Sequence, residues 1–185
     1  FIASAGDDNF DGGDGTDTVI TAANAVVVVN GDSRFDGVMS VEVSGTGTGT
    51  DTYSGVETIN AGGSLSLTSD ANSTTASVSG GAEIDLTASV RVFDTNGTTL
   101  LDTYSDFADA FNNANAGEVI VLADGNSFDL NGASFDFSKA VTILGSGSDN
   151  AALLTNGTAS ISTSGVTIEG IRVAVADNDT ALTIS

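Results

Sequence analysis

The sequence predicts an all-β fold in which short strands stack on one another, with a single helix. Three observations support this prediction. A glycine- and aspartate-rich pattern repeats at the start of the chain, strand-like segments recur at a nearly constant interval near its end, and one segment has the apolar spacing of a helix.

The composition is that of a chain with a core and a strongly acidic surface. Hydrophobic residues make up 40% of the 185 residues, which is enough for a core, and the formal net charge is −21. Such a surface repels nucleic acids and anionic lipids. No apolar run approaches the length of a membrane span. We therefore expect neither a nucleic-acid partner nor membrane insertion.

Histidine and cysteine are both absent. Their absence excludes Ser-His-Asp and Cys-His catalysis, and it excludes zinc or iron held by histidine or thiolate. The remaining metal ligands are oxygen atoms, which favour calcium or magnesium.

The glycine- and aspartate-rich pattern occupies two consecutive segments. Residues 12–20 (GGDGTDTVI) align with residues 3–11 (ASAGDDNFD), nine positions earlier. In this alignment Gly15 matches Gly6, Asp17 matches Asp8 and Val19 matches Phe10, and Phe1 lies one further repeat upstream of Phe10. The pattern resembles the nonapeptide G-G-x-G-x-D-x-U-x of the RTX family, where U is a large apolar residue. The second copy matches every defined position, whereas the first has Ala3 and Ser4 in place of two glycines.

This resemblance implies a β-roll that binds calcium between stacked turns. Glycine permits the positive φ that exposes main-chain carbonyls, and aspartate adds a carboxylate beside them. By resemblance, Asp8 and Asp17 are the side-chain ligands. The remaining candidate ligands are Gly6, Gly13, Asp14 and Gly15. The alternative is an acidic glycine-rich turn without an ion.

The middle of the chain, residues 31–88, is predicted to be rich in strands. Residues 45–63 are similar to segments that link blocks of RTX repeats, and short strands follow at intervals typical of a sandwich, a barrel or a continued solenoid. The sequence leaves these three folds open.

Residues 105–117 (SDFADAFNNANAG) form the predicted helix. We expect Ser105 to cap its amino-terminal end and Gly117 to end it. Its apolar stripe consists of Phe107, Ala110, Phe111 and Ala114.

Three sets of strand-like segments follow this helix. The first set begins at residues 119, 141 and 166, so its members are 22 and 25 residues apart. The second set lies at 127–130, 152–155 and 171–175, and the third at 135–137, 160–162 and 182–184. The turn after each member of the second set contains an asparagine, namely Asn131, Asn156 and Asn178. Three strands in each of three coils predict a parallel β-helix, with Ile143 stacked on Ile168 and the three asparagines aligned at a corner.

The order of helix and strands over residues 90–185 is similar to the start of right-handed β-helix domains, a family that includes pectate lyases, tailspikes, alginate epimerases and bacterial surface proteins. The resemblance implies that the helix caps the first coil. The predicted organisation is an RTX-like segment at 1–30, a β-rich region at 31–88 and a β-helix at 89–185. We expect this β-helix to be truncated, because Ser185 lies within the third coil.

The basic residues of the predicted coils are Lys139 and Arg172, and these are the groups that a β-helix lyase or epimerase would need. The acids available beside them are Asp124, Asp129, Asp136 and Asp177. We favour a solvated strand end for Lys139 and a charge paired with Glu169 or Asp129 for Arg172. In addition, a surface with a net charge of −21 repels polyuronate substrates. We therefore expect no enzymatic activity.

Four N-x-[ST] sequons are present, at Asn72, Asn96, Asn156 and Asn178. Chains rich in serine and threonine produce such sequons by chance, so they matter only where the cell glycosylates them.

Two functions remain open. The first is a secreted, calcium-binding structural or adhesive protein of the cell surface, such as a component of a surface layer, fibre or matrix. Its expected partners are calcium, further copies of the chain in a filament or layer, and a polysaccharide or cell surface. The alternative is the front part of a β-helix polysaccharide lyase, epimerase or phage tailspike whose active face lies downstream.

Overall fold

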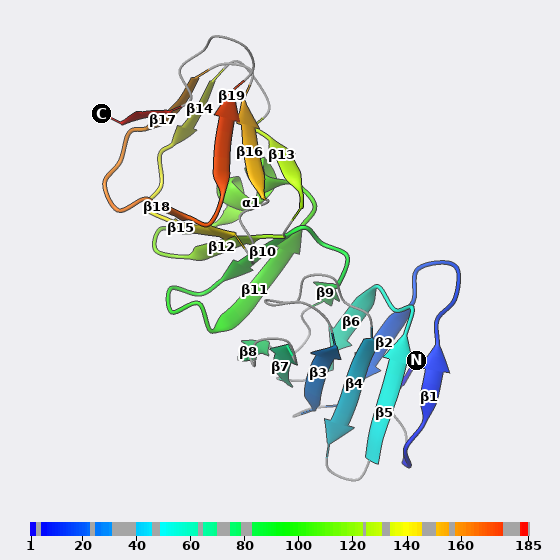
Figure 1. Ribbon diagram of the computed structural model, residues 1–185. Helices are drawn as coiled ribbons and strands as arrows, with labels where there is room; N and C mark the ends of the chain where they lie inside the picture. The colour runs from blue at the N-terminus through cyan, green and yellow to red at the C-terminus, as the bar shows by residue number, and fades with distance from the viewer. Residues whose placement is uncertain are drawn as a thin grey trace. The chain divides into compact units, whose positions relative to one another are not determined.

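A computed structural model describes most of the chain, which is mostly β (Figure 1). The described residues are 1–2, 5–22, 25–30, 40–45, 49–62, 65–69, 75–78, 83–123, 125–130, 134–145, 151–155, 158–175 and 182–184. The chain divides into two compact units. The first contains residues 1–88 and 98–102, and the second contains residues 89–97 and 103–185.

The first unit contains two sheets. Its strands are β1 (Asn9–Asp11), β2 (Thr18–Thr21), β3 (Val26–Asn30), β4 (Ser40–Gly45), β5 (Gly49–Ser54), β6 (Thr58–Ala61), β7 (Leu65–Ser69), β8 (Thr75–Val78) and β9 (Glu83–Asp85). One sheet has the order β1-β5-β4-β3-β7-β8, and the start of β11 (Thr99–Tyr104) pairs with β8. The other sheet has the order β2-β6-β9. Residues 1–30 and 31–88 thus contribute strands to the same sheets.

Parallel pairs in this unit stack one turn of chain on another. β1 pairs in parallel with β5, and β2 with β6. On the far side of β2, Ile2 forms a parallel bridge with Ile20, and the amide of Ile20 donates to the carbonyl of Phe1 at 2.8 Å. Antiparallel pairs join β3 to β4, β4 to β5, and β7 to β8. The middle of the chain therefore combines hairpins with stacked parallel strands.

The second unit contains helix α1 (Phe107–Asn113) and the strands β10 (Val90–Phe93), β12 (Val119–Leu122), β13 (Ser127–Asp129), β14 (Ser134–Phe137), β15 (Thr142–Gly145), β16 (Ala152–Thr155), β17 (Thr158–Ile161), β18 (Thr167–Glu169), β19 (Arg172–Val175) and β20 (Leu182–Ile184). Three sets of parallel strands have the orders β12-β15-β18, β13-β16-β19 and β14-β17-β20. β10 pairs with β12 in the antiparallel direction. The three sets of strands predicted from the sequence are present, although the second member of the third set begins at Thr158 rather than at residue 160.

The register of these strands aligns apolar residues. Ile143 lies between Ile120 and Ile168, as the sequence predicted for Ile143 and Ile168. In the next set, Leu153 lies between Phe128 and Val173. Ile120, Ile143 and Leu153 are all fully buried, so the rows of side chains form the core of this unit. The predicted corner of Asn131, Asn156 and Asn178 lies outside the described residues.

Helix α1 is shorter than predicted, and its cap is a different residue. Asp106, not Ser105, is the cap, because its Oδ1 accepts the amides of Ala108 at 2.8 Å and Asp109 at 3.1 Å. The helix ends at Asn113, with Ala114 as its carboxyl-terminal cap, so Gly117 lies beyond it. The short side chain of Asp106, directly before the first turn, reaches two amides that have no partner in the helix. Asp106 is therefore the cap in place of the predicted Ser105.

The apolar stripe of α1 is buried as predicted. Phe107 and Phe111 pack against Phe135 and Phe137 of β14, with ring centroids 5.2–6.3 Å apart.

Lys139 fixes the carboxyl-terminal end of α1. Its Nζ donates to the carbonyl oxygens of Phe111 at 2.8 Å, Asn112 at 2.6 Å and Ala114 at 3.0 Å. A cation is favourable at this end of a helix, where the last carbonyls lack partners in the helix. The structural role of Lys139 is therefore to bind the end of a helix, and it differs from the solvated strand end predicted from the sequence.

Candidate functional site

The acidic glycine-rich segment forms two turns, one before β1 and one between β1 and β2. Gly6 in the first turn and Gly13 and Gly15 in the second have φ values of +123°, +75° and +130°, a range that favours glycine. The second turn lies close against the turn between β5 and β6, since a Cβ atom on Gly12 would collide with the carbonyl oxygen of Gly55. Glycine at this position therefore lets two turns stack.

Asp17 and Glu57 occupy matching positions in these two stacked turns, and we call them the Asp17–Glu57 pair. Each residue directly precedes a strand, and the following residues, Thr18 and Thr58, are register partners. The amide of Asp17 donates to Oε2 of Glu57 at 2.8 Å, while the carbonyl of Asp17 accepts the amides of Glu57 and Thr58 at 3.2 and 3.1 Å. Both side chains are partly exposed. Two acidic residues thus lie in neighbouring turns, each directly before one of two paired strands.

Asp8 and Asp51 form a second pair at the other end of β1, the Asp8–Asp51 pair. The residues after them, Asn9 and Thr52, are register partners. The amide of Asp8 donates to Oδ1 of Asp51 at 3.2 Å, and the amide of Thr52 donates to the carbonyl of Asp8 at 2.9 Å. Asp8 is exposed, whereas Asp51 has no exposed surface. The second pair therefore joins a buried carboxylate to an exposed one.

Tyr53 supports the buried carboxylate. Its hydroxyl donates to Oδ2 of Asp51 at 3.3 Å, and its ring stacks on Phe10 with centroids 5.0 Å apart and planes 9° apart. Burial of the phenol and, after it, the charge of Asp51 raise the pKa of Tyr53 from 10.0 to about 12. The phenol is therefore a neutral hydrogen-bond donor at physiological pH.

The structure distributes the predicted metal ligands over both turns. Asp8 and Gly6 lie before β1, whereas Gly13, Asp14, Gly15 and Asp17 lie after it, with Asp14 exposed. Asp8 and Asp17 are thus at opposite ends of β1, each beside an acid of the next stacked strand.

The oxygen atoms of the two acidic pairs are the candidate ligands for calcium. In the part of the chain that the structure describes, no three acidic side chains are close enough together to hold a metal ion. Each pair instead places two acidic residues in neighbouring turns, and the main-chain carbonyls of Asp8 and Asp17 accept amides there. Calcium accepts carboxylate and carbonyl oxygens together with water, so an ion at either pair would need ligands beyond these two side chains.

Asp51 and Glu57 are not among the ligands predicted from the sequence, although the sequence contains a signal for both. Asp8-Asn9-Phe10 corresponds to Asp51-Thr52-Tyr53, because each triplet has an acid two positions before a ring. Asp17-Thr18-Val19 corresponds to Glu57-Thr58-Ile59, because each has an acid, a threonine and a β-branched residue. The offsets are 43 and 40 residues, so a search for a nine-residue period does not find them.

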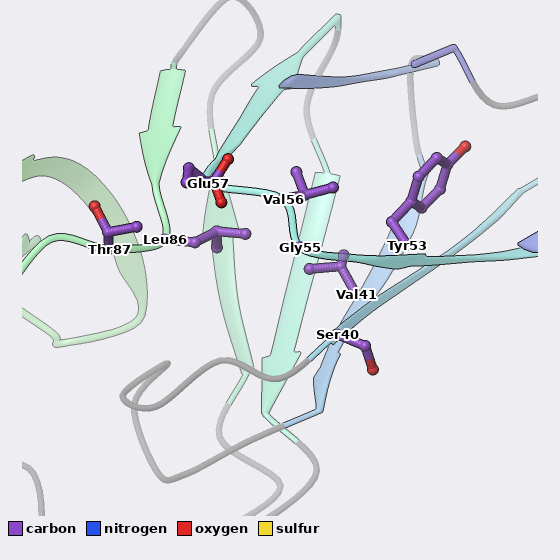
Figure 2. Close-up of a pocket in the computed structure, with 8 residues that line it drawn as sticks. All are labelled: Ser40, Val41, Tyr53, Gly55, Val56, Glu57, Leu86 and Thr87. Carbon is purple, nitrogen blue, oxygen red and sulfur yellow. The ribbon is translucent and has the colours of Figure 1, made fainter. Parts of the chain in front are cut away.

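A pocket of about 200 Å³ adjoins the Asp17–Glu57 pair (Figure 2). Among the described residues that line it, Glu57 supplies an acidic group and Ser40, Tyr53 and Thr87 bear hydroxyls. The remaining lining residues are Val41, Gly55, Val56 and Leu86. Glu57 thus faces both a stacked turn and a small cavity.

Comparison with known proteins finds no matching family model, no similar curated protein and no similar solved structure. Among the described residues, no helix is long and apolar enough to cross a membrane.

Proposed function

We propose that this chain is part of a secreted, calcium-binding structural or adhesive protein of the cell surface. The observation that carries the proposal is the register of the acidic residues. Asp8 lies beside Asp51 and Asp17 lies beside Glu57, one pair at each end of β1. Like charges opposite one another on paired strands are unfavourable unless something neutralises them.

Calcium is the ion that best offsets this repulsion. The chain has four basic residues for 25 acidic ones, so it cannot neutralise its own carboxylates. Calcium takes carboxylate and carbonyl oxygens in flexible geometry, which suits stacked segments that contribute one acidic residue each. Binding is expected in the range of about 10⁻⁴–10⁻³ M that is typical of extracellular modules.

Both units fit a solenoid architecture of stacked turns. In the first unit, Ile2 pairs with Ile20, an offset of 18 residues that equals two nonapeptides of an RTX-like β-roll. In the second unit, the three sets of parallel strands follow one another in chain order three times, as in the coils of a parallel β-helix. Helix α1 packs its phenylalanines against the first of these coils, as a cap would.

Self-association into a filament or layer belongs to the same proposal. Calcium lowers the repulsion between acidic surfaces, so it should favour contacts between copies of the chain. The alternative of a polysaccharide-active β-helix enzyme has less support, because Lys139 is engaged with three carbonyls of helix α1. A structural role needs no basic catalytic group.

Hydrogen exchange with and without calcium tests the proposal. Millimolar calcium should slow exchange in residues 5–21 and 49–61. In a separate calorimetric titration, the double variant Asp17→Asn/Glu57→Gln should bind calcium at least tenfold more weakly. Glu83→Gln is the matched control, because Glu83 is an exposed glutamate of the same unit, on β9. Exchange that is unchanged by calcium and by a chelator would refute calcium binding.

A further inference from the structure

We infer that Asn96 is an acceptor site for an asparagine-linked glycan. It begins the sequon Asn96-Gly97-Thr98, in which the enzyme reads the hydroxyl two residues after the asparagine. The inference rests on the proposed extracellular location, because that is where such a modification is found. The sequons at Asn72, Asn156 and Asn178 lie outside the described residues, so the structure supports Asn96 alone.

The sequon forms an exposed turn. β10 ends at Phe93 and β11 begins at Thr99, and all four residues from 95 to 98 are exposed. The amide of Gly97 donates to the carbonyl of Asp94 at 2.9 Å, which closes the turn. Gly97 has a φ of +67°, and among the described residues a Cβ placed there would meet Cγ2 of Val119 at 3.8 Å. An acceptor asparagine must enter the cleft of a transferase, and the exposure of Asn96 and its neighbours allows that.

The turn also tolerates the product. A glycan is a large, hydrophilic group that has to remain in solvent, and an exposed turn is where such a group costs least. Asn96 lies between two strands whose neighbouring positions are buried, since Phe93 and Leu100 are 2% and 3% exposed. The Asn96 side chain itself is exposed and takes no part in the core.

The reaction transfers an oligosaccharide from a lipid pyrophosphate carrier. Nδ2 of Asn96 forms a bond to the anomeric carbon of the first sugar, and the bond from that carbon to the pyrophosphate oxygen breaks. The lipid pyrophosphate leaves with the bonding electrons, and the amide proton passes to a base of the transferase. No oxidant or reductant is needed.

Glycan transfer to the purified, folded chain tests the inference. The chain is incubated with an oligosaccharyltransferase and a lipid-linked oligosaccharide, and glycopeptides are mapped by mass spectrometry. A synthetic peptide of residues 92–100 serves as the unfolded reference. We expect Asn96 of the folded chain to be modified at a rate within about tenfold of the peptide. Thr98→Ser should retain modification, whereas Thr98→Val should reduce it at least tenfold.

Two results would overturn the inference. One is a folded chain that stays unmodified at Asn96, whether or not the peptide is modified. The other is modification that persists undiminished in Thr98→Val, since transfer would then not depend on the sequon. Running the reaction in calcium and in a chelator separates this inference from the proposed function, because loss of calcium binding would leave an exposed turn equally competent.

Discussion

Replacing Ile143 with alanine should destabilise the second unit by about 3–4 kcal/mol. Ile143 is completely buried, and its register partners on both sides are also isoleucines, Ile120 and Ile168. Loss of three buried carbon atoms costs about 2–3 kcal/mol in transfer free energy. The neighbouring strands are fixed by main-chain pairing, so they cannot close the cavity, and the cavity adds to the cost within the range of about 2–5 kcal/mol known for such changes.

The assay is denaturant unfolding followed by circular dichroism and by hydrogen exchange in β12 and β15. Two controls define what the register predicts. Ile168→Ala should cost about half as much, because Ile168 is only partly buried. Thr142→Ala, one position away on the same strand, should change the free energy of unfolding by no more than about 0.5 kcal/mol. A cost for Thr142→Ala that equals or exceeds that of Ile143→Ala would show that the stacking register is wrong.

Two further predictions concern other parts of the chain. Asp106→Ala should lower the stability of the second unit by about 0.5–2 kcal/mol through loss of the helix cap, whereas Ser105→Ala should have little effect. Equal losses of stability for the two variants in thermal unfolding would contradict the assignment of the cap. The pKa of Tyr53 is raised from 10.0 to about 12, so the stability that it contributes should be complete below pH 10 and should be lost as the pH rises from 10 to 12. A spectrophotometric titration that compares the chain with Tyr53→Phe measures this pKa, and a Tyr53 transition near pH 10 would contradict the buried hydrogen bond to Asp51.

The strands of the second unit could be predicted because two periodic signals coincide. Apolar triplets and the turns between them recur together, so the positions of β12, β15 and β18 and the contact between Ile143 and Ile168 follow from spacing alone. The helix cap could not be predicted, because Ser105 and Asp106 are both good caps in adjacent positions. The choice depends on which side chain reaches the free amides once Phe107 is buried, and that is decided by tertiary packing.

The role of Lys139 also depends on packing. In the sequence Lys139 is a single cation that precedes a strand, and no helix lies near it along the chain. The fold brings it to the end of α1, more than 20 residues earlier, where three carbonyls accept its hydrogen bonds. The neighbouring sequence is compatible with a structural or a catalytic role for Lys139, but it does not identify the carbonyls that Lys139 binds.

The acidic pairs explain why the repeat in the sequence predicts fewer stacked turns than the fold contains. Two nonapeptides alone would form a single turn, in which Asp8 and Asp17 lie at opposite ends of β1 with no second carboxylate beside either. The chain then forms the antiparallel strands β3 and β4 before it returns, and β5 and β6 pair in parallel with β1 and β2 at offsets of 43 and 40 residues. Because the inserted strands change the spacing, Asp51 and Glu57 match the repeat in space without matching its period. Asp51 and Glu57 each have an acidic counterpart in the neighbouring stacked turn, so the charge recurs in space although the nine-residue period does not recur in the sequence.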